Sequence, residues 1–212
     1  MSKFVYFLIF LAVMLLVWVT WSYFVIRNVE QLKYQVLEQN ENYEVRQYEP
    51  SLLAETVIED VGYSEALNEG FRRIAGYIFG GNKSQESIAM TAPVTEEGSE
   101  KIAMTVPVTE EKQSEKSRKV AFVMPSKYSM DTLPIPNDDR VKLREVPARK
   151  MAVLSFGWYP TADNVEAKKL ELVDALRAKG VKYVGMPIYA GYNPPFSFPL
   201  FLKNEIMVEL AE

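Results

Sequence analysis

One ten-residue phrase occurs twice in this chain, and each copy carries a methionine whose thioether could act as a soft metal ligand. The first copy spans residues 88–97, the second spans residues 102–111, and the two differ at a single position. Successive side chains of a strand point to opposite faces, so each methionine would share a face with isoleucine and valine. A methionine in such an apolar stripe is more often packing than ligand. We therefore expect a hairpin of two strands whose methionines, Met90 and Met104, face the core.

The composition removes most other site chemistry. The 212 residues include no cysteine and no histidine. Disulfides, thiolate nucleophiles, Ser-His-Asp triads and the usual zinc ligand sets are therefore excluded. Aspartate, glutamate, tyrosine and lysine could still perform acid-base chemistry, but no paired carboxylates or nucleophile arrangement stands at a recognisable spacing. We expect a protein that is not an enzyme.

The charge balance argues against a nucleic-acid partner. The chain has 24 basic and 28 acidic residues, which gives a formal net charge of -4. These charges are spread along the sequence, so no basic face of the kind that binds a phosphate backbone is predicted.

The amino-terminal segment has the length and polarity of a membrane span. Residues 4–26 contain no charged side chain, and roughly 20 apolar residues cross a bilayer as a helix. Aromatic residues crowd the end of this segment, where a cleaved signal peptide would have small ones, and Arg27 follows on the polar side. We predict a transmembrane anchor over residues 1–27 with a cytoplasmic N-terminus. Residues 28–42 are expected to form a short juxtamembrane helix or tether.

The remaining residues, 43–212, are predicted to form one domain of strands and helices. Alternating or continuous apolar patterns predict strands at 43–48, 52–58, 120–124, 141–146, 150–156, 183–189 and 205–210. The charged run at 110–119 has no apolar stripe and is predicted to be a solvated loop.

Two helices are predicted from apolar spacing and end signals. The first begins at Ser64, carries apolar residues at steps of three and four, and stops at Gly80-Gly81. The second begins near Thr161 and ends at Gly180.

The order of these elements repeats. Residues 141–156 can be laid on residues 43–58, and the same offset brings the second helix onto the first. The chain therefore predicts two strand-strand-helix-strand units related by a pseudo-twofold axis. Because two helices cannot cover a flat sheet completely, we expect an α+β fold, a distorted β-barrel with two principal helices outside it, preceded by one transmembrane helix. A groove is expected at the junction of the units, where small-molecule sites tend to lie.

Several phrases, taken together and in order, resemble the SOUL haem-binding protein family. They lie at residues 43–46, 81–84, 88–94, 122–126, 143–146 and 190–195. The resemblance implies a distorted barrel of two pseudo-symmetric halves over residues 43–212. It also implies tetrapyrrole binding in a shallow apolar groove beside the first helix. We expect a membrane-anchored bacterial-type member, in the inner membrane with its soluble domain on the periplasmic side.

The basic helix positions that some family members place near haem propionates fall at Asn68 and Gly76 in this chain. Neither residue is basic, but Arg72 and Arg73 could pair with carboxylates from nearby, or form a solvated helix face. The predicted cofactor-binding residues are Leu67, Phe71, Arg72, Arg73, Ile74, Tyr77, Met90 and Met104.

Iron ligation is restricted by the lack of histidine. The oxygen and sulfur donors that remain in principle are Met90, Met104, Tyr77 and Tyr192. A porphyrin can also be held without axial protein bonds, by burial of its rings and pairing of its propionates. We predict no metal ligand.

These observations predict a membrane-anchored binding protein for haem or a related tetrapyrrole, without histidine ligation, that serves as carrier, buffer or sensor. The alternative is a tethered binding domain for another amphipathic small molecule or a protein partner, with no haem function. The segment 192–196, which contains two consecutive prolines, is either a lid or partner surface with aromatic anchors, or a rigid crossover that tucks its aromatics under the barrel.

Overall fold

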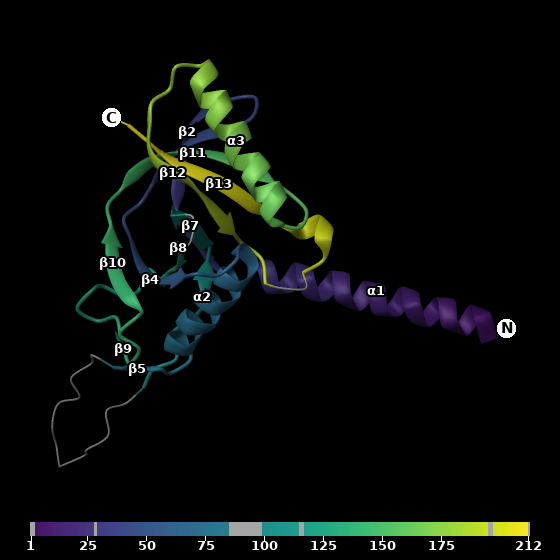
Figure 1. Ribbon diagram of the computed structural model, residues 1–212. Helices are drawn as coiled ribbons and strands as arrows, with labels where there is room; N and C mark the ends of the chain where they lie inside the picture. The colour runs from purple at the N-terminus through teal and green to yellow at the C-terminus, as the bar shows by residue number, and fades with distance from the viewer. Residues whose placement is uncertain (1–2, 28, 85–98, 115–116, 195–196, 212) are drawn as a thin grey trace, which may run out of the picture.

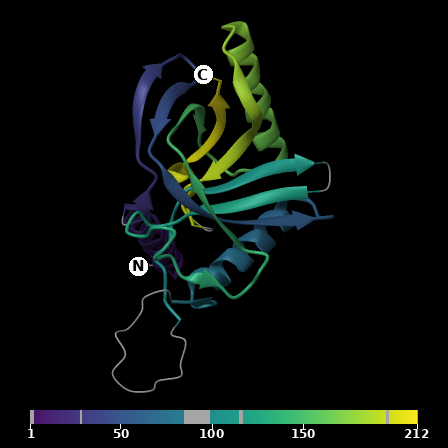
Figure 2. The same ribbon diagram turned by 90° about the vertical axis from the view of Figure 1, so that its left-hand side faces the viewer.

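The computed structural model describes residues 3–27, 29–84, 99–114, 117–194 and 197–211 (Figure 1). A nine-stranded antiparallel sheet forms the centre of the fold. Its strands are, in order across the sheet, β10 (Lys142–Val146), β4 (Ser51–Glu59), β8 (Ser117–Val123), β7 (Val108–Ser114), β12 (Tyr183–Gly191), β13 (Asn204–Leu210), β11 (Arg149–Phe156), β3 (Glu44–Tyr48) and β2 (Tyr34–Gln39). The sheet curls into a half-barrel with β10 and β2 as its edges, where a distorted barrel was expected (Figure 2).

The strand order is symmetric about the pairing of β7 with β12. On one side follow β8, β4 and β10, and on the other side follow the corresponding strands β13, β11 and β3. Helix α2 (Tyr63–Ile78) comes after β4 and packs on β4 and β8, and α3 (Ala162–Ala178) comes after β11 and packs on β11, β12 and β13. The two predicted units are therefore present. Each contains four strands of the sheet, one more than a strand-strand-helix-strand unit has.

The missing strand in the first unit is the charged run. Of the run at 110–119, which was predicted as a solvated loop, residues 110–114 belong to β7 and residues 117–119 belong to β8, with Ser114 opposite Ser117. The prediction was wrong because cross-strand ion pairs satisfy the charges. Glu110 accepts from Arg118 at 2.7 Å, and Lys119 pairs with Glu111 at 2.7 Å. Opposite charges on facing strands stabilise a sheet without an apolar stripe.

The segment after the first helix is extended, and the predicted juxtamembrane helix is absent from its described residues. β1 (Glu30–Gln31) pairs with β6 (Thr105–Val106), and β2 pairs with β3. The ring of Tyr34 lies 5.2 Å from the ring of Tyr48. The guanidinium of Arg46 lies 4.2 Å above the Tyr34 ring. These partners are supplied by β3, so extended pairing outweighs the helical spacing of the apolar residues.

The first copy of the repeated phrase, with Met90 and the first strand of the predicted hairpin, lies outside the described residues. In the second copy, Ile102 is buried as expected, but Met104 is 36% exposed. The inward placement of Met104 was wrong because its neighbour Thr105 turns inward and donates its hydroxyl to the Val123 carbonyl. Adjacent side chains of an extended segment point to opposite sides, so Met104 faces out.

Both helices end where glycine permits a left-handed backbone. Gly80 has φ of 118° and Gly180 has φ of 65°. The hydroxyl of Thr161 accepts from the Asn164 amide, which confirms the start of α3. The start of α2 differs from the prediction, because Gly62 and not Ser64 is the N-cap residue.

Each principal helix seals its own core. Ile74 and Ile78 of α2 pack with Phe122 of β8, and Leu172 of α3 packs with Ile206 of β13. Two short strands, β5 (Asn82–Lys83) and β9 (Ile135–Pro136), pair beyond the end of α2.

Helix α1 (Lys3–Arg27) projects from the domain as a separate rod (Figure 1). Its residues Lys3–Phe24 are long and apolar enough to cross a membrane, and a signal sequence would have the same properties.

Candidate functional site

An apolar groove of about 340 Å³ lies between α2 and residues 192–203, the connection from β12 to β13. Ligand sites in proteins usually occupy about 300–1,000 Å³, so this groove is large enough for a small molecule. One wall comes from α2 and contains Leu67, Asn68 and Phe71. The remaining lining residues are Val108, Tyr159, Pro160, Tyr189, Gly191, Asn193, Pro194, Ser197, Leu202 and Asn204.

The α2 wall is positioned by close helix-to-sheet contact. A Cβ atom added at Gly70 would lie 2.6 Å from Val120 of β8, so only glycine allows this approach. The ring of Phe71 lies 5.3 Å from that of Phe122. Because α2 is seated this tightly, Leu67 and Phe71 present a fixed apolar surface to the groove.

The opposite wall is held by side-chain bonds within the connection. Asn193 donates to the Phe201 carbonyl at 3.0 Å and accepts from the Lys203 amide at 2.6 Å. The Tyr192 hydroxyl donates to buried Glu205 at 2.5 Å. These bonds make the segment rigid, as the crossover alternative expected, but Phe198 and Phe201 lie against α1 and not under the barrel. Of the predicted aromatic anchors, Phe196 lies outside the described residues.

One polar group at the base of the groove is a neutral phenol. Tyr189 donates its hydroxyl to Asn204 at 2.8 Å. Burial raises the pKa of Tyr189 well above its usual value of 10.0, and the nearby Glu110 carboxylate raises it further. At neutral pH this residue therefore offers a hydrogen bond and not a phenolate.

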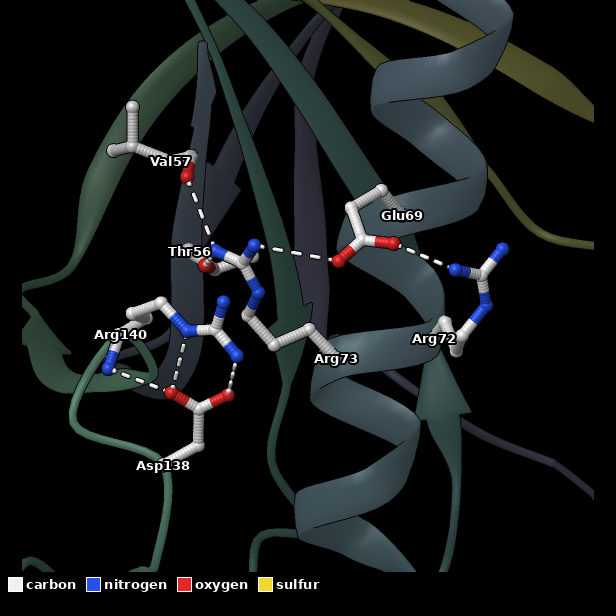
Figure 3. Close-up of polar contacts among 7 residues, drawn as sticks. All are labelled: Thr56, Val57, Glu69, Arg72, Arg73, Asp138 and Arg140. Carbon is white, nitrogen blue, oxygen red and sulfur yellow. Dashed lines mark hydrogen bonds and ion pairs between the residues drawn. The ribbon is translucent and has the colours of Figure 1, made fainter.

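The two arginines of α2 have different environments (Figure 3). Arg73, whose side chain is 11% exposed, donates to the Thr56 hydroxyl at 2.8 Å and to the Val57 carbonyl at 3.3 Å, so it is bound to β4. Arg72 is 75% exposed and pairs with Glu69 at 2.7 Å. Arg72 also lines a surface hollow with Asn68, which borders the groove. Arg72 is therefore the arginine whose charge can reach a ligand in the groove.

The structure brings together only part of the predicted site. Leu67 and Phe71 line the groove, and Arg72 lies beside it. Ile74 is fully buried in the core, and Tyr77 is buried with its hydroxyl bonded to the Pro134 carbonyl at 2.7 Å. Met104 does not line the groove, and Met90 lies outside the described residues.

Sequence reasoning missed Tyr159, Tyr189 and Leu202. Tyr189 directly precedes the phrase at 190–195 that carries part of the family resemblance, and that position was the available signal. Tyr159 and Leu202 had no signal, because neither lies in a motif and both reach the groove through tertiary folding.

The described lining of the groove is mainly apolar. In the described part of the chain, no group of three or more acidic side chains could hold a metal ion, and the chain has no histidine or cysteine. The phenols of Tyr77 and Tyr192, which were candidate iron donors, are buried in bonds to Pro134 and Glu205. Tyr159, which is half exposed, is the more accessible of the two phenols that line the groove.

Three proteins are similar in sequence to this chain over most of its length. Heme-binding protein 2 of Mus musculus is 29% identical over 179 residues, which cover 79% of this chain and 82% of the relative. Heme-binding protein 2 of Homo sapiens is 30% identical over 169 residues, with 78% and 76% covered. Heme-binding protein 1 of Bos taurus is 27% identical over 183 residues, with 84% and 91% covered.

Solved structures share the fold at low identity. The EcmrR C-terminal domain is 10% identical, with a TM-score of 0.56 over 84% of this chain and 98% of that domain. An uncharacterized conserved protein from Listeria innocua is 11% identical, with a TM-score of 0.51 over 81% and 93%. These likenesses concern the fold and not the ligand.

The family comparison covers the whole curled sheet with both principal helices. Because the model described as SOUL heme-binding protein matches residues 29–209, this chain belongs to the SOUL heme-binding protein family.

Proposed function

We propose that this protein binds haem or a related tetrapyrrole in the groove between α2 and residues 192–203, and that α1 anchors it in a membrane. The role is that of a carrier, buffer or sensor, and not of a catalyst. The observation that carries the proposal is an apolar groove beside α2 in a chain whose family is named for haem binding.

Apolar groove residues contact the rings of the tetrapyrrole, and a basic residue pairs with its carboxylates. Leu67, Phe71 and Leu202 bury one part of the macrocycle by apolar contact. A propionate that extends past Asn68 reaches Arg72. The Arg72 guanidinium then leaves its exposed ion pair with Glu69 and pairs with the propionate. Haem, when bound, supplies a redox-active iron and a strong absorption band. Since the chain has no histidine, axial ligation by imidazole plays no part.

A second candidate ligand is an amphipathic small molecule other than a tetrapyrrole. The specific observation that favours it is the shortage of positive charge at the groove. Asn68 occupies one basic position of the family, and Arg73 is bound to β4. A ligand with one anionic group would need only one positively charged partner, and Arg72 could provide it.

Titration of the full chain in lipid nanodiscs with haem and with metal-free protoporphyrin tests the proposal. We expect saturable micromolar binding of both, with affinities within about threefold of each other, because burial and not iron ligation provides the free energy. The porphyrin absorption band and tryptophan quenching report binding. Empty nanodiscs provide the correction for porphyrin that dissolves in lipid. Absence of saturable binding of either compound contradicts the proposal and leaves the second candidate.

Two matched leucines localise the binding. Leu67→Glu places a charge on the groove wall and is expected to weaken binding about tenfold or more, or about 1.4 kcal/mol. Leu170→Glu is the control, because Leu170 is exposed on α3. Equal affinities for the two variants would place the ligand elsewhere. Tyr159→Phe tests iron ligation, and an unchanged haem spectrum is expected.

The membrane orientation stays a prediction. The expected arrangement has a cytoplasmic N-terminus and a domain in the periplasm of a bacterium. A C-terminal phosphatase fusion, active only after export, is expected to be active, and an inactive but intact fusion would reverse the orientation.

A further inference from the structure

The most exposed large apolar side chain among the described residues lies in the loop beside α1. Leu200 is 75% exposed, and it belongs to the short helix η1 (Pro199–Phe201). The loop sequence from 197 to 202 contains no charged residue and two phenylalanines. Figure 1 shows α1 leaving the domain beside this yellow segment. An exposed apolar loop of this kind requires a partner other than water.

The loop contacts α1 through aromatic rings and one hydrogen bond. The Phe198 ring meets the Trp18 ring edge-on at 5.1 Å, and the Phe201 ring lies 6.5 Å from that of Tyr23. The Phe198 amide donates to the hydroxyl of Ser22 at 2.9 Å, and Ser22 is completely buried by this contact. The loop is therefore docked on the last turns of the apolar helix.

The level of this contact along α1 is inside the apolar span. The span ends at Phe24, and a helix rises about 1.5 Å per residue, so Trp18 lies about 9 Å before its end. If α1 crosses a bilayer over Lys3–Phe24, a loop that touches Trp18 and Ser22 must lie below the headgroups. Its exposed side chains then meet lipid.

Four of the five backbone amides of residues 197–202 have partners within the described part of the protein, the exception being Leu200. Amides at 197, 201 and 202 donate to the carbonyls of Pro194, Phe198 and Pro199. The amide at 198 is bonded to Ser22, and Pro199 has none to satisfy. Irregular backbone is tolerated at membrane depth only where its polar groups have protein partners, and this loop meets that condition for these donors.

A cation follows the loop where the chain returns to the sheet. Lys203 lies with its amine 4.1 Å above the Tyr192 ring and 3.3 Å from Glu205, and its side chain is partly exposed. Lysine next to an aromatic ring is typical of the boundary between hydrocarbon and headgroups.

We infer that residues 197–202 insert into the lipid bilayer as a second membrane contact beside α1, and that the groove opens at the membrane surface. Ser197 and Leu202 belong both to this loop and to the groove wall. The ligand class is therefore an amphipathic molecule that partitions into the membrane and enters the groove from it. This inference rests on the proposed anchoring by α1, and it holds whether or not the ligand is a tetrapyrrole.

The absence of cysteine makes a direct test simple, because single labels can be placed in the full chain. Leu200→Cys carries an environment-sensitive fluorophore in the loop. Leu170→Cys on exposed α3 is the water control, and Val13→Cys in the middle of α1 is the lipid control. The protein is reconstituted in phosphatidylcholine vesicles. Spin-labelled phosphatidylcholine quenches labels in lipid, and iodide quenches labels in water.

We expect the Leu200 label to behave like the Val13 label, with quenching by spin-labelled lipid at least about threefold stronger than at Leu170, because quenching needs close contact with the acyl chains. Quenching of the Leu200 label by iodide alone, with Val13 still quenched by lipid, overturns the loop inference and leaves the anchor. A Leu200 label shielded from both quenchers indicates a protein contact and also overturns it. If Val13 is not quenched by lipid, both the anchor and the loop inference fail. None of these outcomes depends on haem binding.

Discussion

Helix α2 borders a ligand-sized groove that both halves line, whereas the corresponding helix α3 presents a charged, solvated face. The exposed side of α3 carries ion pairs such as Lys168–Glu171 and Arg177–Asp174. The strands of the two halves correspond, so the sheet does not cause this difference. The cause lies in the connections. β7 and β8 follow each other closely in the chain, but β12 and β13 are separated by a longer connection, whose described residues 193, 194, 197 and 202 line the groove with α2.

The two halves also differ in how they bury a carboxylate. Glu205 of the second half is fully buried and pairs with buried Arg46 at 2.9 Å, while it accepts from Tyr192 at the start of the groove wall. Glu110 of the first half is also fully buried and pairs with Arg118, which is more exposed than Arg46. The connection from β12 to β13 is therefore bonded, through Tyr192, to the more buried of the two ion pairs.

The largest expected effect is at this cluster. Glu205→Ala leaves the Arg46 guanidinium buried without its main partner, so the free energy of unfolding should fall by about 3–5 kcal/mol. Thermal unfolding in detergent, followed by near-ultraviolet circular dichroism, measures the loss. Glu209→Ala on the same strand is the control, because Glu209 is half exposed and pairs with Arg149 at 3.5 Å. Equal losses for both variants would show that burial of the pair is unimportant.

The next effect concerns the packing of α2 on the sheet. Helix α2 contains two glycines, whereas α3 contains none. Gly70→Ala should lower the free energy of unfolding by about 1–3 kcal/mol, because its Cβ would meet Val120 at 2.6 Å. Gly76→Ala meets no atom within 4 Å and should raise it by about 0.5–1 kcal/mol. The same unfolding measurement applies. Two changes of the same sign would contradict the close packing of α2 on β8.

A smaller effect separates the two arginines of α2. Arg73→Ala removes bonds to Thr56 and Val57 and should cost about 1–2 kcal/mol of stability. Arg72→Ala should change stability by about 0–0.5 kcal/mol, since its ion pair is exposed. Ligand affinity should respond in the opposite order, with a loss for Arg72→Ala only. Weaker ligand binding by Arg73→Ala at unchanged stability would indicate that Arg73 also contacts the ligand.

The smallest effect is the pH dependence contributed by Tyr192, a buried phenol next to the groove-lining residues Gly191 and Asn193. Burial, followed by the Glu205 carboxylate, raises the pKa of Tyr192 well above 10.0. The folded state then keeps a proton that the unfolded state loses above pH 10.0, so this contribution to stability is complete below that pH and declines above it. The decline is at most about 1.4 kcal/mol per pH unit. Tyr192→Phe should flatten the curve above pH 10.0, and an unchanged slope would contradict the shift.

The predictable part of the fold is the part that local pattern controls. The strands from Tyr43 onward and both principal helices follow apolar spacing, and the offset between residues 43–58 and 141–156 predicts the two related halves. The charged strands β7 and β8 could not be predicted in this way. Their stability comes from pairs such as Glu110 with Arg118, and such pairs exist only after the strands are aligned.

The candidate site was predictable only on one side. Leu67 and Phe71 follow from the helix face and the family resemblance, and the structure places both at the groove. The same helical spacing also selected Ile74, which the sheet covers completely. Periodicity identifies an apolar face, but it does not tell which part of that face a neighbouring element leaves uncovered.

The sequence by itself determined the family, the apolar N-terminal helix, the two related halves and the chemistry that the lack of histidine and cysteine excludes. These properties depend on composition and on order along the chain. Tertiary structure decided which helix borders the groove, which arginine is available and why Met104 points outward. Each of these depends on a contact between distant segments, such as residues 192–203 against α2 or Thr105 against Val123, whose energy arises only when the chain is folded.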